Sequence, residues 1–164
     1  MRQSAQERQA GSALALCLSM AALSFGCSSS GPPAPGSFTE VYATVLGTPT
    51  CTNDYCHYEY SSISFGALDL SSQTNAYWNL VDQYCAGDAC GGMGRKRVIP
   101  GDPNGSILYL KISETNPACG IQMPANTALF METAGGTTKF TGPALTTAQQ
   151  QLIYNWILNG AQNN

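Results

Sequence analysis

The residues of this chain that are best suited to chemistry lie in the segment Cys51-Thr-Asn-Asp-Tyr-Cys56-His57, which contains the only histidine of the 164 residues. Two cysteine thiols can form thioethers with the vinyl groups of a haem, and an imidazole that follows directly can ligate the iron. The usual spacing for this attachment is C-x-x-C-H, whereas four residues separate the cysteines here. The segment is therefore a candidate site for covalent haem attachment with a longer spacing.

The four intervening residues determine how both sulfurs can reach one haem. Cysteines three positions apart lie about one helical turn from each other, whereas cysteines five positions apart are rotated by about 500°, which leaves them about 140° apart. The segment between Cys51 and Cys56 must therefore leave the helix as a bulge. Thr, Asn and Asp favour turns, so the composition of this segment suits a bulge.

A haem that only carries electrons needs a second axial ligand, and methionine opposite histidine leaves no open position for a substrate. The methionines that follow the N-terminal segment are Met93, Met123 and Met131. Met123 is favoured because it precedes Pro124, whose ring stiffens the backbone next to the thioether. With one histidine and no Ser/His/Asp pattern, the sequence favours an electron carrier over a hydrolytic enzyme.

Two other interpretations of this segment remain open. Cys51 and Cys56 can instead form a local disulfide with His57 exposed, which makes the protein a haem-free, disulfide-stapled binding or structural module on the cell surface. A metal-ion site is the other interpretation. Structural zinc is disfavoured because such sites use four nitrogen or sulfur ligands with short paired spacings.

The N-terminal residues have the pattern of an export signal. Arg2 and Arg8 precede an apolar run over residues 13–25, which is too short for a typical membrane span and has the length of a signal h-region. The run ends before Gly26-Cys27, which resembles a bacterial lipoprotein cleavage site. We therefore expect residues 1–27 to be a signal peptide of lipoprotein type with Cys27 lipidated; ordinary signal cleavage, with Cys27 an incidental thiol, is the alternative.

Export places the mature chain in the periplasm, at the outer membrane or on the cell surface. Residues 28–36 are rich in Ser, Pro and Gly and predict a flexible tether, and residues 37–164 suit one domain. From Ser28 onward the chain has nine acidic and five basic residues. The basic cluster Arg95-Lys96-Arg97 is too small for nucleic-acid binding, so we expect a solvated loop, with docking of an acidic redox partner as the functional alternative.

The first and last helices have clear start signals. Ser37 and Glu40 have the S-x-x-E spacing of a capping box, and Gly47 can close this helix in the left-handed conformation. Thr147 and Gln150 have an equivalent spacing before the last helix, which Gly160 can end. The apolar residues share one face in each helix: Phe38, Val41, Tyr42, Val45 and Leu46 in the first, and Ala148, Leu152, Ile153, Trp156 and Ile157 in the last.

Two further helices are predicted between them. One starts near Ser72 and carries the apolar residues Ala76, Tyr77, Leu80, Val81 and Tyr84. The other has Asp102 as N-cap and Pro103 at its first position. Residues 127–142 suit a loop, with a short hairpin as the alternative. The fold class is therefore mainly α, a small helical domain with long loops and no obvious large apolar core, so we expect disulfides or a bulky cofactor to organise its interior.

Five segments together resemble the cytochrome c-like domains found in exported proteins of planctomycetes and myxobacteria. The matching segments are Cys51–His57, Gly66–Leu70, Arg97–Pro103, Cys119–Pro124 and Trp156–Ile157 with Gly160-Ala161, in the expected order across residues 38–161. The resemblance implies a cytochrome c-like domain over residues 37–164 that transfers single electrons through one covalent haem c. It implies thioethers at Cys51 and Cys56, His57 and Met123 as axial ligands, and a disulfide between Cys90 and Cys119 that leaves Cys85 over.

Overall fold

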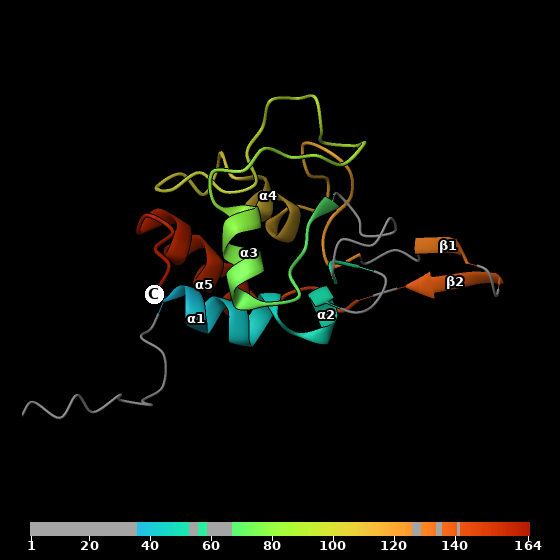
Figure 1. The fold of residues 1–164 in the computed structure, drawn as a ribbon, viewed down its shortest axis with the longest axis horizontal. Coiled ribbons are helices and arrows are strands. Elements are labelled where there is room, and N and C mark those ends of the chain that lie inside the picture. The colour runs from blue at the N-terminus through green and yellow to red at the C-terminus, as the bar shows by residue number, and fades with distance from the viewer. Residues whose placement is uncertain (1–35, 53–55, 59–66, 126–128, 134–135, 141) are drawn as a thin grey trace, which may run out of the picture. The chain divides into compact units, whose positions relative to one another are not determined.

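The computed structural model describes residues 36–52, 56–58, 67–125, 129–133, 136–140 and 142–164. The described part of the chain is mainly helical, as the sequence predicts (Figure 1). Its elements are α1 (Phe38–Val41), η1 (Tyr42–Leu46), α2 (Pro49–Thr52), α3 (Gln73–Leu80), α4 (Ile107–Ser113), β1 (Leu129–Thr133), β2 (Gly136–Phe140) and α5 (Thr147–Leu158). The predicted signal peptide, Cys27 and nearly all of the predicted tether lie outside the described residues.

The first predicted helix is formed by α1 and the π-helical turn η1. The Ser37 hydroxyl accepts from the backbone N–H of Glu40 at 3.1 Å, as the capping pattern predicts. The Glu40 carboxylate accepts from the Gly36 N–H at 2.7 Å. The expectation of a left-handed Gly47 is wrong, because its φ is −83°. A side chain is excluded there by packing, since a Cβ atom would lie 2.7 Å from the Tyr42 ring.

Helix α3 starts where the sequence predicts, because the Ser72 hydroxyl accepts from the Asn75 N–H at 3.1 Å. Its predicted continuation through Tyr84 is wrong. Val81 is extended, and Asp82 has a φ of 57°, which a right-handed helix cannot continue. Val81 instead forms a β-bridge with Val98, and Tyr84 forms one with Lys96. These bridges replace the helical pairing that a longer α3 would have made.

The starts of the last two helices are shifted from their predicted positions. Ser106 is the N-cap of α4, and the predicted cap Asp102 instead closes the preceding turn by accepting from the Gly105 N–H at 2.9 Å. The capping box of α5 is formed by Thr146 and Gln149, one residue before the predicted pair. The predicted end of α5 is confirmed, because Gly160 has a φ of 94°.

The segment predicted as a loop over residues 127–142 contains the hairpin that was its alternative. Strands β1 and β2 are antiparallel, with Leu129 opposite Phe140 and Thr133 opposite Gly136.

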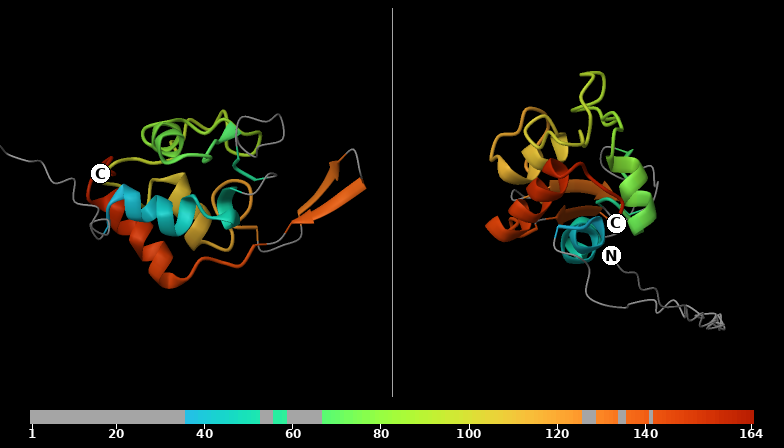
Figure 2. Two further views of the ribbon diagram at one scale, coloured as in Figure 1. Left: turned by 60° about the horizontal axis from the view of Figure 1, so that its bottom comes forward. Right: turned by 90° about the vertical axis from the view of Figure 1, so that its left-hand side faces the viewer.

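The helices bury a packed apolar core. The expectation that the domain lacks a large apolar core is therefore wrong. Figure 2 shows α1 and η1 lying along α5, and α5 also contacts α4. The core combines residues of these helices with residues of the loops between them: Phe38, Val41, Val45, Leu46, Leu70, Ala76, Leu80, Val98, Ile112, Leu145, Ile153, Trp156, Ile157 and Ala161. Trp156, which the sequence places in the core, is 1% exposed, and its ring centroid lies 4.9 Å from that of Phe38.

The last residue of the chain is bonded to the start of α1. The Asn164 backbone carbonyl accepts from the Thr39 N–H at 2.9 Å. The Asn164 side-chain carbonyl accepts from the Phe38 N–H at 3.0 Å. The two N–H groups belong to the first turn of a helix, where no intrahelical acceptor exists. Asn164 therefore supplies the acceptors that the first turn of α1 lacks.

The contact between Phe38 and Trp156 predicts a large cost for truncation at position 38. Phe38→Ala should lower the free energy of unfolding by about 3–5 kcal/mol, because it removes a fully buried ring and leaves a cavity. Leu158→Ala is the control, because Leu158 lies on α5 but is 49% exposed. Urea unfolding followed by circular dichroism measures both, and equal effects of the two changes would contradict this packing.

Candidate functional site

The cysteine–histidine segment forms a closed loop. Cys51 and Thr52 end the short helix α2, and the backbone N–H of His57 donates to the Cys51 carbonyl at 3.1 Å. His57 therefore lies beside Cys51, and the bulge that the sequence predicts between Cys51 and Cys56 falls mainly on residues 53–55. Residues 53–55 lie outside the described residues.

Cys51, Cys56 and Cys85 are thiols in the structure. Burial, and secondarily the charge of Cys56, raise the pKa of Cys51 from 9.0 to about 12. At neutral pH Cys51 is accordingly a neutral thiol and a weak nucleophile.

The imidazole of His57 is oriented by a backbone carbonyl. Its Nδ1 lies 3.3 Å from the Leu68 oxygen. Because a carbonyl oxygen can only accept, this hydrogen bond requires the proton on Nδ1, which leaves the lone pair of the neutral ring on Nε2. Histidines that ligate metals usually donate their other ring N–H to a carboxylate, a backbone carbonyl or water, which fixes the tautomer and raises the basicity of the ligating nitrogen. The hydrogen bond of His57 to Leu68 is of the kind that can orient a ligating histidine.

The Leu68 carbonyl belongs to four consecutive backbone carbonyls, residues 67–70, that we call the carbonyl run. Each of them accepts from a side chain of another segment. The donors are Arg97 Nη2 to Ala67 at 3.1 Å, His57 Nδ1 to Leu68 at 3.3 Å, Asn79 Nδ2 to Asp69 at 3.3 Å and Tyr42 Oη to Leu70 at 3.1 Å. The run is therefore held from η1, α3, the segment around Arg97 and the histidine itself.

Asp69, which belongs to the carbonyl run, is 5% exposed, and its side chain makes two further hydrogen bonds. Its carboxylate accepts from the Ser71 N–H at 2.8 Å and from Asn75 Nδ2 at 2.9 Å. Burial, and then the negative charge of Asp69, raise the pKa of Tyr42. Tyr42 consequently stays protonated as a donor to Leu70.

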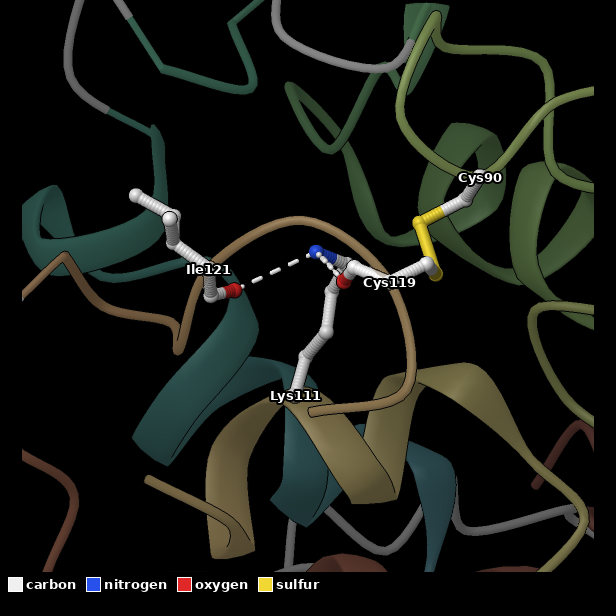
Figure 3. Close-up of a disulfide and its surroundings, with 4 residues drawn as sticks. All are labelled: Cys90, Lys111, Cys119 and Ile121. Carbon is white, nitrogen blue, oxygen red and sulfur yellow. Dashed lines mark hydrogen bonds between the residues drawn. A yellow bond between two sulfur atoms is a disulfide. The ribbon is translucent and has the colours of Figure 1, made fainter. Parts of the chain in front are cut away.

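The loop that carries Met123 is fastened by Lys111 of α4. Lys111 Nζ donates to the carbonyls of Cys119 at 3.0 Å and Ile121 at 3.2 Å (Figure 3), and the Lys111 carbonyl accepts from the Met123 N–H at 2.7 Å. Gly120, with a φ of 64°, leaves room for the ammonium, because a Cβ there would lie 2.8 Å from Nζ. Burial lowers the pKa of Lys111, and Cys85 opposes this effect.

The disulfide that the resemblance implied is present. Cys90 and Cys119 are joined with an S–S distance of 2.10 Å, in a small apolar cluster with Ile107 and Leu110. Cys85 packs against this cluster as a thiol. Burial raises its pKa, while nearby cations, Arg97 first, act in the opposite direction.

The Met123 segment lies on the same side of the domain as the cysteine loop. A Cβ atom on Gly142 would lie 2.8 Å from the Pro124 ring and 3.7 Å from the Thr50 methyl group, so both side chains adjoin one point. Thr50 directly precedes Cys51. The pairing of Met123 with His57 across an iron atom stays a prediction.

The basic cluster is only partly the solvated loop that the sequence suggests. Arg97 is 8% exposed and holds the carbonyl run, so this part of the prediction is wrong. Lys96 does lie on the surface, where it pairs with Asp82 at 3.0 Å. No pattern in the sequence marks Tyr42, Asn79 or Lys111 as residues of the site. Arg97, by contrast, begins one of the segments that carry the family resemblance.

Among the described residues, no three His, Cys, Asp or Glu side chains come together as a metal site. The binding of a covalent haem by Cys51, Cys56, His57 and Met123 stays a prediction.

Comparison of the chain with protein-family models, with curated proteins and with solved structures finds no match. In the described ranges, no helix has the length and apolar character needed to cross a membrane.

The raised pKa of Cys51 predicts slow alkylation in the reduced, haem-free protein. At pH 8 a shift from 9.0 to about 12 leaves roughly a thousandfold less thiolate, so iodoacetamide should modify Cys51 about a thousandfold more slowly than in the urea-unfolded chain. The rate for the folded chain should rise about tenfold per pH unit between pH 9 and 12. Peptide mass spectrometry separates Cys51 from the other thiols.

Cys56→Ser is the matched variant for this measurement. It removes the neighbouring charge, so it should lower the pKa of Cys51 and speed its alkylation. Equal rates for the folded and unfolded chains would contradict the buried environment of Cys51. A requirement for reductant before either thiol reacts would reveal a Cys51–Cys56 disulfide in the native chain.

Proposed function

We propose that this protein is an exported, cytochrome c-like carrier of single electrons. One haem c is attached through thioethers at Cys51 and Cys56, with His57 and Met123 as axial ligands. The observation that carries the proposal is the hydrogen bond from His57 Nδ1 to the Leu68 carbonyl, directly beside Cys56. A ligating histidine needs this second interaction, and a histidine exposed beside a local disulfide does not.

The haem supplies a reversible one-electron change, and the residues of the chain hold and tune it. The closed loop from Cys51 to His57 brings two sulfurs and an imidazole into one short segment. The Leu68 carbonyl keeps the imidazole in the Nδ1–H tautomer. The Lys111-fastened loop holds Met123 in a fixed backbone position, and a methionine ligand leaves no site for a substrate, which favours a carrier over an enzyme.

The proposed setting is a membrane surface outside the cytoplasm. Lipidation of Cys27 would anchor the chain to a membrane, and residues 28–36 would let the domain reach a redox partner protein. The partner is a protein rather than nucleic acid, because the burial of Arg97 reduces the small basic cluster further.

A haem-free, disulfide-stapled module is the second candidate function. It is favoured by the Cys90–Cys119 disulfide and by the packed helical core, since both stabilise the domain without a cofactor. In this function the domain keeps the cytochrome-like scaffold as a binding or structural unit.

Covalent haem loading distinguishes the two functions. The full chain, produced in a host with haem-attachment machinery, should gain the mass of one haem that survives denaturation and stains on a denaturing gel. Cys56→Ser should prevent attachment of the haem through two thioethers. Cys85→Ser is the control and should bind haem as the wild type does, because Cys85 packs beside the disulfide. A wild-type chain with the mass of the bare polypeptide would exclude the electron-carrier function.

The loaded protein also tests the second axial ligand. Met123→Ala should lower the midpoint potential and change the visible spectrum. Loss of the methionine sulfur would remove one of the two ligands that the chain offers to the iron. Met93→Ala is the control, since Met93 is 53% exposed in a Gly-rich loop. Spectra and potentials of Met123→Ala that match the wild type would rule out Met123 as a ligand.

A further inference from the structure

Arg97 is a buried cation whose two guanidinium arms bind different segments. Nη1 donates to the Asn79 carbonyl at 2.7 Å and Nη2 to the Ala67 carbonyl at 3.1 Å. Asn79 lies in the last turn of α3, where carbonyls lack intrahelical partners. The planar fork of arginine suits two simultaneous hydrogen bonds, which a lysine ammonium cannot make in the same geometry. Arg97 therefore ties the end of α3 to the start of the carbonyl run.

The backbone of Arg97 is fixed independently of its side chain. Its N–H donates to the Gln83 carbonyl at 2.7 Å, and its own carbonyl accepts from the Leu108 N–H at 2.9 Å. The next residue, Val98, pairs with Val81. The guanidinium is consequently presented from a rigid base, as a positioning group requires.

The residue that Arg97 holds has an unusual backbone conformation. Ala67 has a φ of 48°, in the left-handed region that is unfavourable for a residue with a side chain. Ala67 is followed directly by Leu68, whose carbonyl accepts from His57. Arg97 thus binds the carbonyl of a residue in an unfavourable conformation, directly before the carbonyl that accepts from His57.

We infer that Arg97 is a positioning residue for His57. By holding Ala67, Arg97 directs the Leu68 carbonyl toward the imidazole ring, and this carbonyl fixes the Nδ1–H tautomer. The inference deepens the proposed function and rests on it only where it names iron as the atom that His57 binds. Loss of the Leu68 hydrogen bond would make the ligating nitrogen less basic. The resulting iron site would favour the oxidised state less, which raises the midpoint potential.

The tautomer can be measured without any cofactor, because His57 is the only histidine in the chain. In the full haem-free chain, ¹⁵N NMR at a pH where the ring is neutral should show the Nδ1–H tautomer in the wild type. Arg97→Lys keeps the positive charge but loses the fork, so the ratio of Nδ1–H to Nε2–H should fall about two- to tenfold, the range that one hydrogen bond supports. An unchanged ratio in a folded Arg97→Lys chain would overturn the inference.

Two control variants separate positioning from general loosening. Tyr42→Phe removes another donor to the carbonyl run but leaves the Leu70 N–H bond to the His57 carbonyl in place. Lys96→Met removes the neighbouring surface cation. Both should keep the wild-type tautomer ratio, and a fall in both equal to that of Arg97→Lys would assign the effect to stability alone and defeat the inference.

A rescue experiment tests the role of Ala67 directly. Glycine adopts positive φ without the cost that alanine has, so Ala67→Gly in the Arg97→Lys chain should restore part of the lost Nδ1–H population. No recovery in a folded double variant would contradict the proposed route through Ala67. Should Arg97→Lys not fold, NMR couplings across the Arg97–Ala67 and His57–Leu68 hydrogen bonds in the wild type decide the matter, and absence of either coupling overturns the inference.

The loaded protein shows which proposal fails. If the chain takes up haem, Arg97→Lys should raise the midpoint potential relative to the wild type. Haem loading with an unchanged tautomer and potential defeats the positioning role and leaves the electron-carrier function intact. A chain that never loads haem but whose tautomer depends on Arg97 defeats the electron-carrier function and leaves the positioning role intact.

Discussion

Backbone carbonyls that lie outside any helix or sheet need hydrogen-bond donors, and this need organises the candidate site. The carbonyl run from Ala67 to Leu70 meets it with side chains from separated parts of the chain, among them Tyr42, Asn79 and Arg97. A buried polar group without a partner costs about 1–3 kcal/mol, so the donors to the buried residues Asp69 and Leu70 stabilise the fold. The same requirement places His57 beside Leu68, and the residue of interest for chemistry is thereby part of the structural framework.

The helical core and the candidate site depend on each other only in part. Phe38, Trp156 and their neighbours pack without a cofactor, and the disulfide joins Cys90 to Cys119 in a separate cluster. The sequence predicts that a bulky cofactor or disulfides organise the interior, because no large apolar core is evident in it. The core was missed because several of its members, such as Leu70, Val98 and Leu145, come from loops in which no periodic pattern marks them.

Structural features that neighbouring residues determine were predicted well from the sequence. Features that depend on distant partners were not. Ser37, Ser72 and Gly160 mark helix boundaries through their own hydroxyls or backbone freedom, so a few neighbouring residues suffice to identify them. The early end of α3 depends on the pairing of Val81 with Val98, a residue far along the chain. Arg97 looked solvated beside Arg95 and Lys96, because only the folded chain brings the Ala67 carbonyl to it. The pairing of Cys90 with Cys119 was predicted only through the family resemblance, since spacing alone does not determine pairing.

The bonds between Asn164 and the first turn of α1 have a mechanical consequence. Asn164 supplies acceptors for two backbone N–H groups that the helix itself leaves without partners. Fraying at either end of the described domain therefore removes hydrogen bonds from the other end, although the two segments lie far apart in the sequence.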